Sequence, residues 1–466
     1  MFSLFIPAIV MFLFSFKKRC RILPLISLST LLPVLYLFVQ GGDVSVYGDY
    51  LIADDLAKYI LLVSAIVQIG VTLSLESLEH HVRISKNAYR RFYRFFSIFW
   101  IGLMASILAN NMGIYWIGLE TATLSTVYMI KTNSSDQAHR EAWNYMIVGT
   151  IAISLILFGI ILIYASAKSV LGEDAMQFNL LLAHAGDIEN PFLFELGFAF
   201  VAIGMFIKMG FFPMNLWLAN IERASFYPVA ALFSGILESA VIIGFFRFSD
   251  IAKAIDYPHL VGFSYFYGLL TLIFVSFLIF RAKDFMRLFS LSGIEHMVLI
   301  MLFWVSGGYF AALLHFGAHA FLKPALFIST GVLESNGKYR IAGALRGYSG
   351  KMGKSFWFLV GLFIVAIISI PPSPMFFSEI YGFGAMVDLA KRSDHLLLML
   401  GGITLVLIML SVIFYRFTEV YQSMKYEGEA EPKKLYLSEV VTLVIFAVAL
   451  AALLLPETFA FIRSIR

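Results

Sequence analysis

Residues 192–217 read FLFELGFAFVAIGMFIKMGFFPMNLW, and the apolar sequence resumes at residues 228–235 with PVAALFSG. The first part has the composition of a membrane-spanning helix, yet it contains Lys208 and is followed by Gly210 and Pro213. A lysine near the middle of a bilayer costs about 2.5–3.5 kcal/mol on insertion scales, and glycine and proline free backbone carbonyls that lipid cannot satisfy. A charge beside a broken helix indicates a functional site, and we expect that site to transport ions.

The composition of the whole chain excludes a soluble domain. Of the 466 residues, 60% are hydrophobic and 14% are charged, and the mean hydropathy is +0.85. Apolar runs long enough to cross a bilayer recur from end to end, which predicts an all-α polytopic membrane protein. The single cysteine, Cys20, excludes an internal disulfide, an iron–sulfur cluster or a cysteine-based zinc site. We therefore expect no redox or hydrolytic site and no cofactor in this chain.

Lysine and arginine are unequally distributed between the two sides of the predicted spans. They number 24 on the side reached after odd-numbered spans and 8 on the other side. By the positive-inside rule, this predicts a cytoplasmic (inner) membrane protein with both termini on the external side. The basic loops 83–94 and 338–354 are expected to act as topology signals and to contact membrane lipids. The fourteen predicted spans are 2–16, 22–40, 56–78, 95–110, 112–130, 142–165, 192–212, 228–248, 260–280, 288–306, 308–332, 356–381, 395–418 and 436–462.

Two interrupted spans predict an internal repeat. Residues 192–212 contain Lys208 with Pro213 just beyond, and residues 356–381 contain Pro371, Pro372 and Glu379. If spans 4–8 and 9–13 are two five-helix units, broken helices 7 and 12 hold the same place in each, and the odd number of spans makes the units inverted. The predicted division is 1–94 for helices 1–3, 95–248 for the first repeat, 260–418 for the second, inverted repeat and 436–466 for helix 14.

Three ionisable residues fall within the first repeat. Glu120 has no charged neighbour in its own span, so we expect its partner on another helix, and Lys208 is the natural candidate. An ion pair that forms and breaks changes the proton affinity of a buried amine, which makes such a pair a proton switch; the alternative is a static structural pair. Gly235 and Ser239 flank Glu238 and indicate close helix packing, so Glu238 lies either on the conduction line or against a partner subunit.

His315, His319 and Lys323 are spaced four residues apart. On a helix they form one stripe about 12 Å long. Imidazole titrates near neutrality, so two imidazoles and an amine along an apolar helix predict a proton relay. A metal site is not predicted, because no acidic third ligand is close in sequence. We expect Pro324 to break this helix and to mark a hydrated position.

Two further residues complete the predicted path. His296, beside Glu295 near the start of its span, is expected either to gate proton uptake from the cytoplasm or only to anchor the helix at the interface. Glu379 lies beyond the Pro371–Pro372 break and is expected to accept the relayed proton and pass it to water. Five unpaired charges at mid-membrane would cost about 13–17 kcal/mol. A subunit that only anchors its partners would gain nothing from this cost.

These residues, in this order, resemble the antiporter-like membrane subunits of respiratory complex I, the NADH-quinone oxidoreductase family, over most of the chain. Residues 110–120 (NNMGIYWIGLE) and the lysine after the second histidine are most similar to the hydrogenase-4 component F type, found in group 4 hydrogenases and formate hydrogenlyase-like complexes. The motifs that carry the resemblance are WIGLE at 116–120, KMGFFP at 208–213 with Trp217, SGIEHM at 292–297, the stripe of His315, His319 and Lys323, and IPPSPMFFSE at 370–379.

The resemblance implies that Glu120 pairs with Lys208, that the histidine–lysine stripe is the central relay and that Glu379 is the exit residue. It also implies other membrane-arm subunits and peripheral redox subunits as partners, with iron–sulfur clusters and, in a hydrogenase, a nickel–iron centre on those partners. The sequence departs from the family after Lys208: the usual Pro-x-His-x-Trp-Leu-Pro and second histidine are replaced at Asn215, Ala219 and Glu222.

The predicted function is a proton-translocating, antiporter-like subunit in the membrane arm of a complex I-related oxidoreductase, of the group 4 hydrogenase type. Three alternatives stay open. The first is a subunit of a multisubunit Mrp-type cation/proton antiporter, with sodium as the counter-ion. The second is a scaffold subunit that has lost transport. The third is a membrane partner that supplies proton flux to an inorganic-carbon uptake complex.

Overall fold

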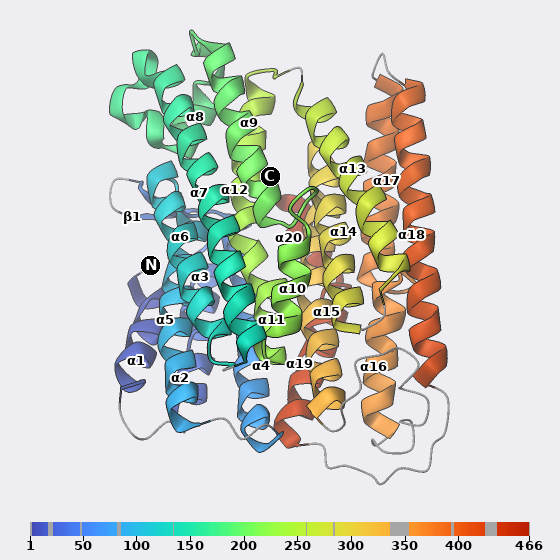
Figure 1. Ribbon diagram of the computed structural model, residues 1–466. Coiled ribbons are helices and arrows are strands. Elements are labelled where there is room, and N and C mark those ends of the chain that lie inside the picture. Colours follow the sequence, from blue (N-terminus) through green and yellow to red (C-terminus); the bar gives the residue numbers. More distant parts are fainter. Residues whose placement is uncertain are drawn as a thin grey trace. The chain divides into compact units, whose positions relative to one another are not determined.

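The structure is a computed structural model that describes residues 2–16, 22–46, 49–81, 85–133, 135–257, 259–282, 285–335, 354–392, 396–424 and 436–465. Helices account for most of these residues (Figure 1). The described strands form one antiparallel hairpin, β1 (Val44–Val46) and β2 (Leu51–Ala53), in which Val44 pairs with Ala53. Almost all of the basic loop 338–354 lies outside the described residues. The predicted all-α polytopic class is confirmed.

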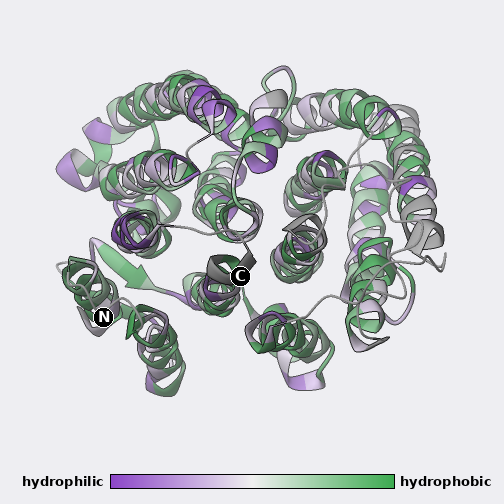
Figure 2. Cartoon of the chain, turned by 60° about the horizontal axis from the view of Figure 1, so that its bottom comes forward, coloured by the Kyte–Doolittle hydropathy of each residue, from purple (hydrophilic) through white to green (hydrophobic). Residues whose placement is uncertain are grey.

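Many of the helices have the length and composition of membrane spans. In the described residues, nine helices are long and apolar enough to cross a membrane, or ten if a bent pair near the C-terminus counts as one span. Figure 2 shows hydrophobic residues along most of the helical surface. The predicted span 2–16 holds only a nine-residue helix, which is too short to cross a bilayer alone. The number fourteen and the inverted repeats stay predictions.

The chain divides into two compact units. Unit 1 consists of Met1–Ala65, Ser85–Trp217 and Leu237–Phe263, and unit 2 of Ile66–Ile84, Leu218–Ile236 and Ser264–Arg466. Each unit is thus assembled from segments that are far apart in the sequence. The predicted division at residues 1–94, 95–248, 260–418 and 436–466 stays a prediction.

Unit 1 is built around helices that approach closely at glycines. A Cβ atom added to Gly118 would lie 2.7 Å from the carbonyl oxygen of Gly102, so the fifth and sixth helices pack backbone against backbone. The helices of unit 1 are α1 (Ile6–Phe14), α2 (Leu23–Leu28), α3 (Leu31–Gln40), the start of α4 (Asp55–His81), α5 (Lys86–Leu108), α6 (Met112–Ile130), α7 (Asp136–Leu171), α8 (Phe178–Ala183), α9 (Pro191–Lys208) and α12 (Glu238–Ala254).

Side-chain caps and a glycine set the ends of the two helices that carry the predicted pair. The side chain of Asn111 accepts backbone hydrogen bonds at the start of α6, and that of Asn190 does so at the start of α9, where Pro191 takes the first position. Helix α9 ends at Lys208. Gly210 follows with a φ of 75°, a conformation that glycine adopts without steric cost. The lysine therefore lies at the end of a helix.

Unit 2 is arranged around α15, which packs against α11, α14, α16, α17 and α19. Along their apolar spans α14 and α15 are completely buried, so polar groups on them face other helices. The elements of unit 2 are the rest of α4, most of α10 (Leu216–Ala224), α11 (Tyr227–Leu232), most of the π-helical segment Phe233–Leu237, most of α13 (Leu260–Phe280), α14 (Phe285–Val305), α15 (Tyr309–Ser335), α16 (Lys354–Ile367), α17 (Pro374–Arg392), α18 (Leu396–Met424), α19 (Leu437–Ala452) and α20 (Pro456–Ser464).

Helix α15 continues through Pro324, which corrects the expected break at that position. Proline has no backbone N–H, so the carbonyl of Ala320 loses its usual partner inside the helix. Gly235 lies against both groups: a Cβ atom there would lie 3.2 Å from the Ala320 oxygen and would collide with the Pro324 ring. The missing side chain at residue 235 makes room for the proline ring, and the helix remains continuous.

Candidate functional site

In unit 1, one buried amine lies close to side chains from two other helices. Lys208 is 5% exposed, and its Nζ donates a hydrogen bond to Oγ1 of Thr123 on α6. The same nitrogen lies 5.9 Å from the centre of the Tyr145 ring on α7. The Tyr145 hydroxyl is 3.1 Å from Oγ1 of Thr126, one turn further along α6. Helices α6, α7 and α9 therefore meet at this lysine.

Glu120 lies one helical turn before Thr123 on the same helix and is half-buried. Its carboxylate interacts electrostatically with Lys208, while its Oε2 has no hydrogen-bond partner among the described residues. The structure thus brings the two predicted residues together, with the direct hydrogen bond of the amine made to Thr123. Helical spacing from Glu120 could have identified Thr123, whereas no sequence signal marks Tyr145.

Glu238 is the first residue of α12 and is 4% exposed. It directly follows the π-helical segment, a distortion that often occurs at functional sites. The next residue, Ser239, accepts a hydrogen bond of 3.2 Å from Ser64 on α4. The serine side of the helix is therefore packed against α4, as the sequence predicts, and the role of Glu238 in conduction stays a prediction.

In unit 2, neutral groups on α14 hold the second buried lysine. Lys323 is completely buried, and its Nζ donates to the carbonyl of Phe289 at 2.8 Å and to Oγ of Ser292. One turn earlier, Nε2 of His319 donates to the carbonyl of Ser234 at 3.1 Å. The ring of His319 lies 5.6 Å from that of His296, measured between ring centres. The stripe on α15 is therefore continued by a histidine on α14.

His296 and His315 are directly hydrogen bonded, with Nδ1 of the first 3.0 Å from Nε2 of the second. Nδ1 of His315 lies 2.8 Å from Oγ of Ser378 on α17. That hydroxyl donates to the carbonyl of Met375, so its oxygen accepts the Nδ1 hydrogen of His315. A neutral His315 then accepts at Nε2 from His296. The hydrogen bonds share one direction, from α14 through α15 to α17.

Two carboxylates lie near this series. Glu379 of α17 is half-buried and accepts a 2.5 Å hydrogen bond from Ser369. Glu295 of α14, which the sequence marks only as a neighbour of His296, is 1% exposed and interacts electrostatically with Lys323 and with Glu379. A carboxylate in a largely apolar span is the signal that could have identified it.

Two non-helical segments lie beside these ionisable residues. Gly210 and Pro213 lie between the end of α9 and the start of α10, and Pro371 and Pro372 lie between α16 and α17. The Phe212–Pro213 and Pro371–Pro372 peptide bonds are cis. In the described part of the chain, no group of three or more His, Cys, Asp or Glu side chains is arranged to bind a metal ion.

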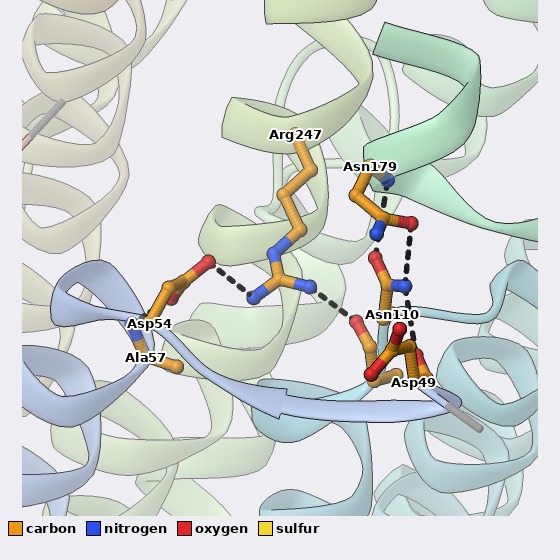
Figure 3. Close-up of polar contacts among 7 residues, drawn as sticks. Asp49, Asp54, Ala57, Asn110, Asn179 and Arg247 are labelled. Carbon is orange, nitrogen blue, oxygen red and sulfur yellow. Dashed lines mark hydrogen bonds and ion pairs between the residues drawn. The ribbon is translucent and has the colours of Figure 1, made fainter. Parts of the chain in front are cut away.

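A separate polar cluster lies at the far end of α12 in unit 1 (Figure 3). Arg247 forms a 3.0 Å ion pair with Asp54 and also donates to the carbonyl of Ala109. The side-chain amide of Asn110 donates to Asn179 on α8 at 2.7 Å. These contacts fix the turn between α5 and α6 to α8, to α12 and to the segment before α4. No motif in the sequence marks this cluster.

Comparisons with known proteins agree on the family. Residues 109–408 match the family model described as "NADH:quinone oxidoreductase/Mrp antiporter, TM". The hydrogenase-4 component F homolog of Methylacidiphilum infernorum (isolate V4) is 30% identical over 342 residues, which cover 71% of each chain.

Solved structures share the fold. A chain of the archaeal membrane-bound sulfane sulfur reductase, a respiratory membrane complex, superposes with a TM-score of 0.85 at 19% identity, over 99% of this chain and 95% of that one. A chain of the Mrp complex from Dietzia sp. DQ12-45-1b gives a TM-score of 0.82 at 14% identity, with coverage of 99% and 95%. The protein therefore belongs to the family of antiporter-like membrane subunits shared by NADH:quinone oxidoreductases and Mrp antiporters.

Proposed function

We propose that this chain translocates protons as an antiporter-like subunit in the membrane arm of a complex I-related oxidoreductase of the group 4 hydrogenase type. The observation that carries the proposal is the buried hydrogen-bonded series His296–His315–Ser378 beside Lys323. Contacts between imidazole and hydroxyl groups let a proton hop through an apolar region that a charged carrier cannot cross cheaply. The likeness to a hydrogenase-4 component F homolog supports the type of complex.

The donor direction in unit 2 sets the order of the proton transfers. Nε2 of His296 has no hydrogen-bond partner among the described residues, so it is the open acceptor. A proton bound there makes the ring cationic, and its Nδ1 hydrogen passes to Nε2 of His315. His315 then releases its Nδ1 hydrogen to Ser378, as the hydroxyl hydrogen of Ser378 turns away from the Met375 carbonyl and leaves towards Glu379. We place Glu379, the next residue on α17, at the exit towards water.

In unit 1 we place a switch at Lys208. The positive charge of the amine is stabilised by the hydroxyl of Thr123 and by the negative charge of Glu120. Protonation of Glu120 removes that attraction, and the amine then gives up its proton more readily because burial disfavours an unpaired charge. Glu238 is placed on the same path as a later carrier.

The test measures proton translocation by the assembled complex in proteoliposomes. Lys208→Ala and Glu120→Gln are each expected to lower the rate by about tenfold or more, as loss of a proton-transfer group does, while assembly stays intact. Lys391→Ala is the matched control, since that lysine is 68% exposed on the surface. Normal translocation by both variants in an intact complex would establish a scaffold role instead.

A subunit of an Mrp-type sodium/proton antiporter is the second candidate, which the family model and the likeness to the Dietzia chain support. The subunits that co-purify with the chain distinguish the two candidate functions. A nickel–iron-type large subunit and iron–sulfur proteins, which would carry the cofactors, fit the first candidate. Other Mrp subunits and proton flux that depends on a sodium gradient fit the second.

We also propose that the chain lies in the cytoplasmic membrane with both termini outside, because lysine and arginine divide 24 to 8 between the two sides. Labelling of single cysteines by a reagent that does not cross the membrane tests this orientation. A cysteine added near Ser464 is expected to react in intact cells. A reaction only after the cells are opened would reverse the orientation.

A further inference from the structure

The sequence analysis assigns no role to Glu295, although the structure buries it more completely than Glu120 or Glu379. It is 1% exposed, and neither carboxylate oxygen has a hydrogen-bond partner among the described residues. A buried carboxylate without hydrogen bonds is unfavourable in its ionised form unless a positive charge or water is close. The group therefore changes its charge state readily when a neighbouring charge changes.

The position of Glu295 on α14 places it beside the second buried lysine. Ser292, which accepts a hydrogen bond from Lys323, lies three residues earlier on the helix. Side chains at this spacing are neighbours on one helix face, so the carboxylate lies one turn from the lysine contact. The adjacent residue, His296, points about 100° away around the helix and bonds to His315. Helix α14 thus presents a histidine in one direction and an acid in another.

The acid also interacts with a titratable group on a second helix. Helix α14 packs against both α15 and α17, and Glu295 interacts electrostatically with Lys323 of the first and Glu379 of the second. The remaining titratable groups that face this region are His296, His315 and His319. An amine and an acid that both interact with one buried carboxylate are a donor and an acceptor for the same proton.

We propose that Glu295 carries protons between Lys323 and Glu379, and that unit 2 therefore has a carboxylate route beside its histidine route, with both routes required in each cycle. Lys323 passes a proton to the ionised carboxylate, and the neutral acid then passes it to Glu379 when that residue is ionised. Glu379 releases its own proton to water between the two transfers, so the two acids never carry more than one negative charge together. The inference rests on the proposed function, because it assumes that protons reach Lys323.

The experiment compares variants of the assembled complex in proteoliposomes by two measurements. The first is proton translocation, and the second is the infrared absorption of protonated carboxyl groups, read as a difference spectrum and shifted by exchange into D₂O. Glu295→Gln is expected to lower translocation by about tenfold and to remove one carboxyl band. Glu295→Asp is expected to recover part of the rate and to move the band. Glu457→Gln is the matched control, an exposed acid in the same unit.

The outcomes separate this inference from the proposed function. Normal translocation by Glu295→Gln, with a severe loss in Lys323→Ala and His315→Gln, would refute the carboxylate route. The proposed function would still hold. Normal translocation by all three variants would overturn the function itself. If Glu295→Gln does not assemble, Glu295→Met, which has a similar shape and no titratable group, takes its place, and the same outcomes decide.

Discussion

The two units each bury a lysine, and they stabilise its charge in different ways. In unit 1, Lys208 bonds to one hydroxyl and depends on a half-buried acid, Glu120. In unit 2, a carbonyl and a hydroxyl of α14 accept hydrogen bonds from Lys323, Glu295 interacts with it electrostatically, and three histidines lie nearby. A charge that depends on one acid can be switched by protonating that acid, whereas a series of imidazoles can pass a proton onward. We therefore propose that unit 1 acts as a switch and that unit 2 conducts.

The largest expected effect tests whether the lysine switch of unit 1 and the proton path of unit 2 act one after the other. Lys208→Ala and Lys323→Ala should each lower proton translocation by about a hundredfold, because each removes a titratable group that its unit does not duplicate. The double variant should be no slower than the single ones, since a blocked series cannot be blocked twice. The rates are measured in proteoliposomes with the assembled complex. Single variants that each keep half of the rate would show two parallel routes.

A smaller effect tests whether proton transfer depends on the imidazole contacts of unit 2 more than on the hydroxyl contacts of unit 1. His315→Gln should lower translocation by about tenfold, because an amide keeps a hydrogen bond to Ser378 but does not relay a proton. Tyr145→Phe in unit 1 should change the rate less than threefold, because its hydroxyl bonds to Thr126 and Thr123, and Thr123 keeps its own bond to Lys208 when that hydroxyl is removed. Equal losses in both variants would mean that unit 1 also conducts through hydroxyl groups.

Close packing should also differ between the units. A Cβ atom on Gly118 of unit 1 would meet backbone atoms of α5, whereas on Gly382 of unit 2 it would meet the ring of Phe303, which can turn. Gly118→Ala should therefore destabilise the protein by about 1 kcal/mol more than Gly382→Ala. Unfolding in mixed detergent micelles measures the difference. A larger loss for Gly382→Ala would place the rigid packing in unit 2.

The smallest expected effect concerns the polar cluster at the end of α12. Asp54→Asn should lower stability by about 0.5–1 kcal/mol, because its ion pair with Arg247 is partly exposed and the arginine keeps its bond to Ala109. Translocation should not change. A lower translocation rate at normal stability would mean that this cluster takes part in proton conduction. The units would then not divide switching and conduction between them.

The sequence predicted the parts of the site that follow from composition and helical spacing. Apolar runs predicted the membrane fold, and the four-residue spacing predicted the stripe on α15, because both depend on local periodicity. The partners of each buried group depend on which helices pack together. The contacts of Lys208 with Thr123 and of His315 with Ser378 therefore needed the structure. The continuous helix at Pro324 also needed it, because the room for the ring comes from Gly235, which is distant in the sequence.

The common donor direction of His296, His315 and Ser378 limits how often the series can work. A proton that has crossed leaves each ring with its hydrogen on the opposite nitrogen, so the next proton meets a filled acceptor. Both imidazole rings must rotate before a second proton can pass. The series cannot carry a proton during that interval. The ring of His315 stands edge-on to Phe303 at 5.7 Å between centres, so we expect this phenylalanine to slow its rotation. An aromatic neighbour that never touches the moving proton would then set the pace of the whole cycle.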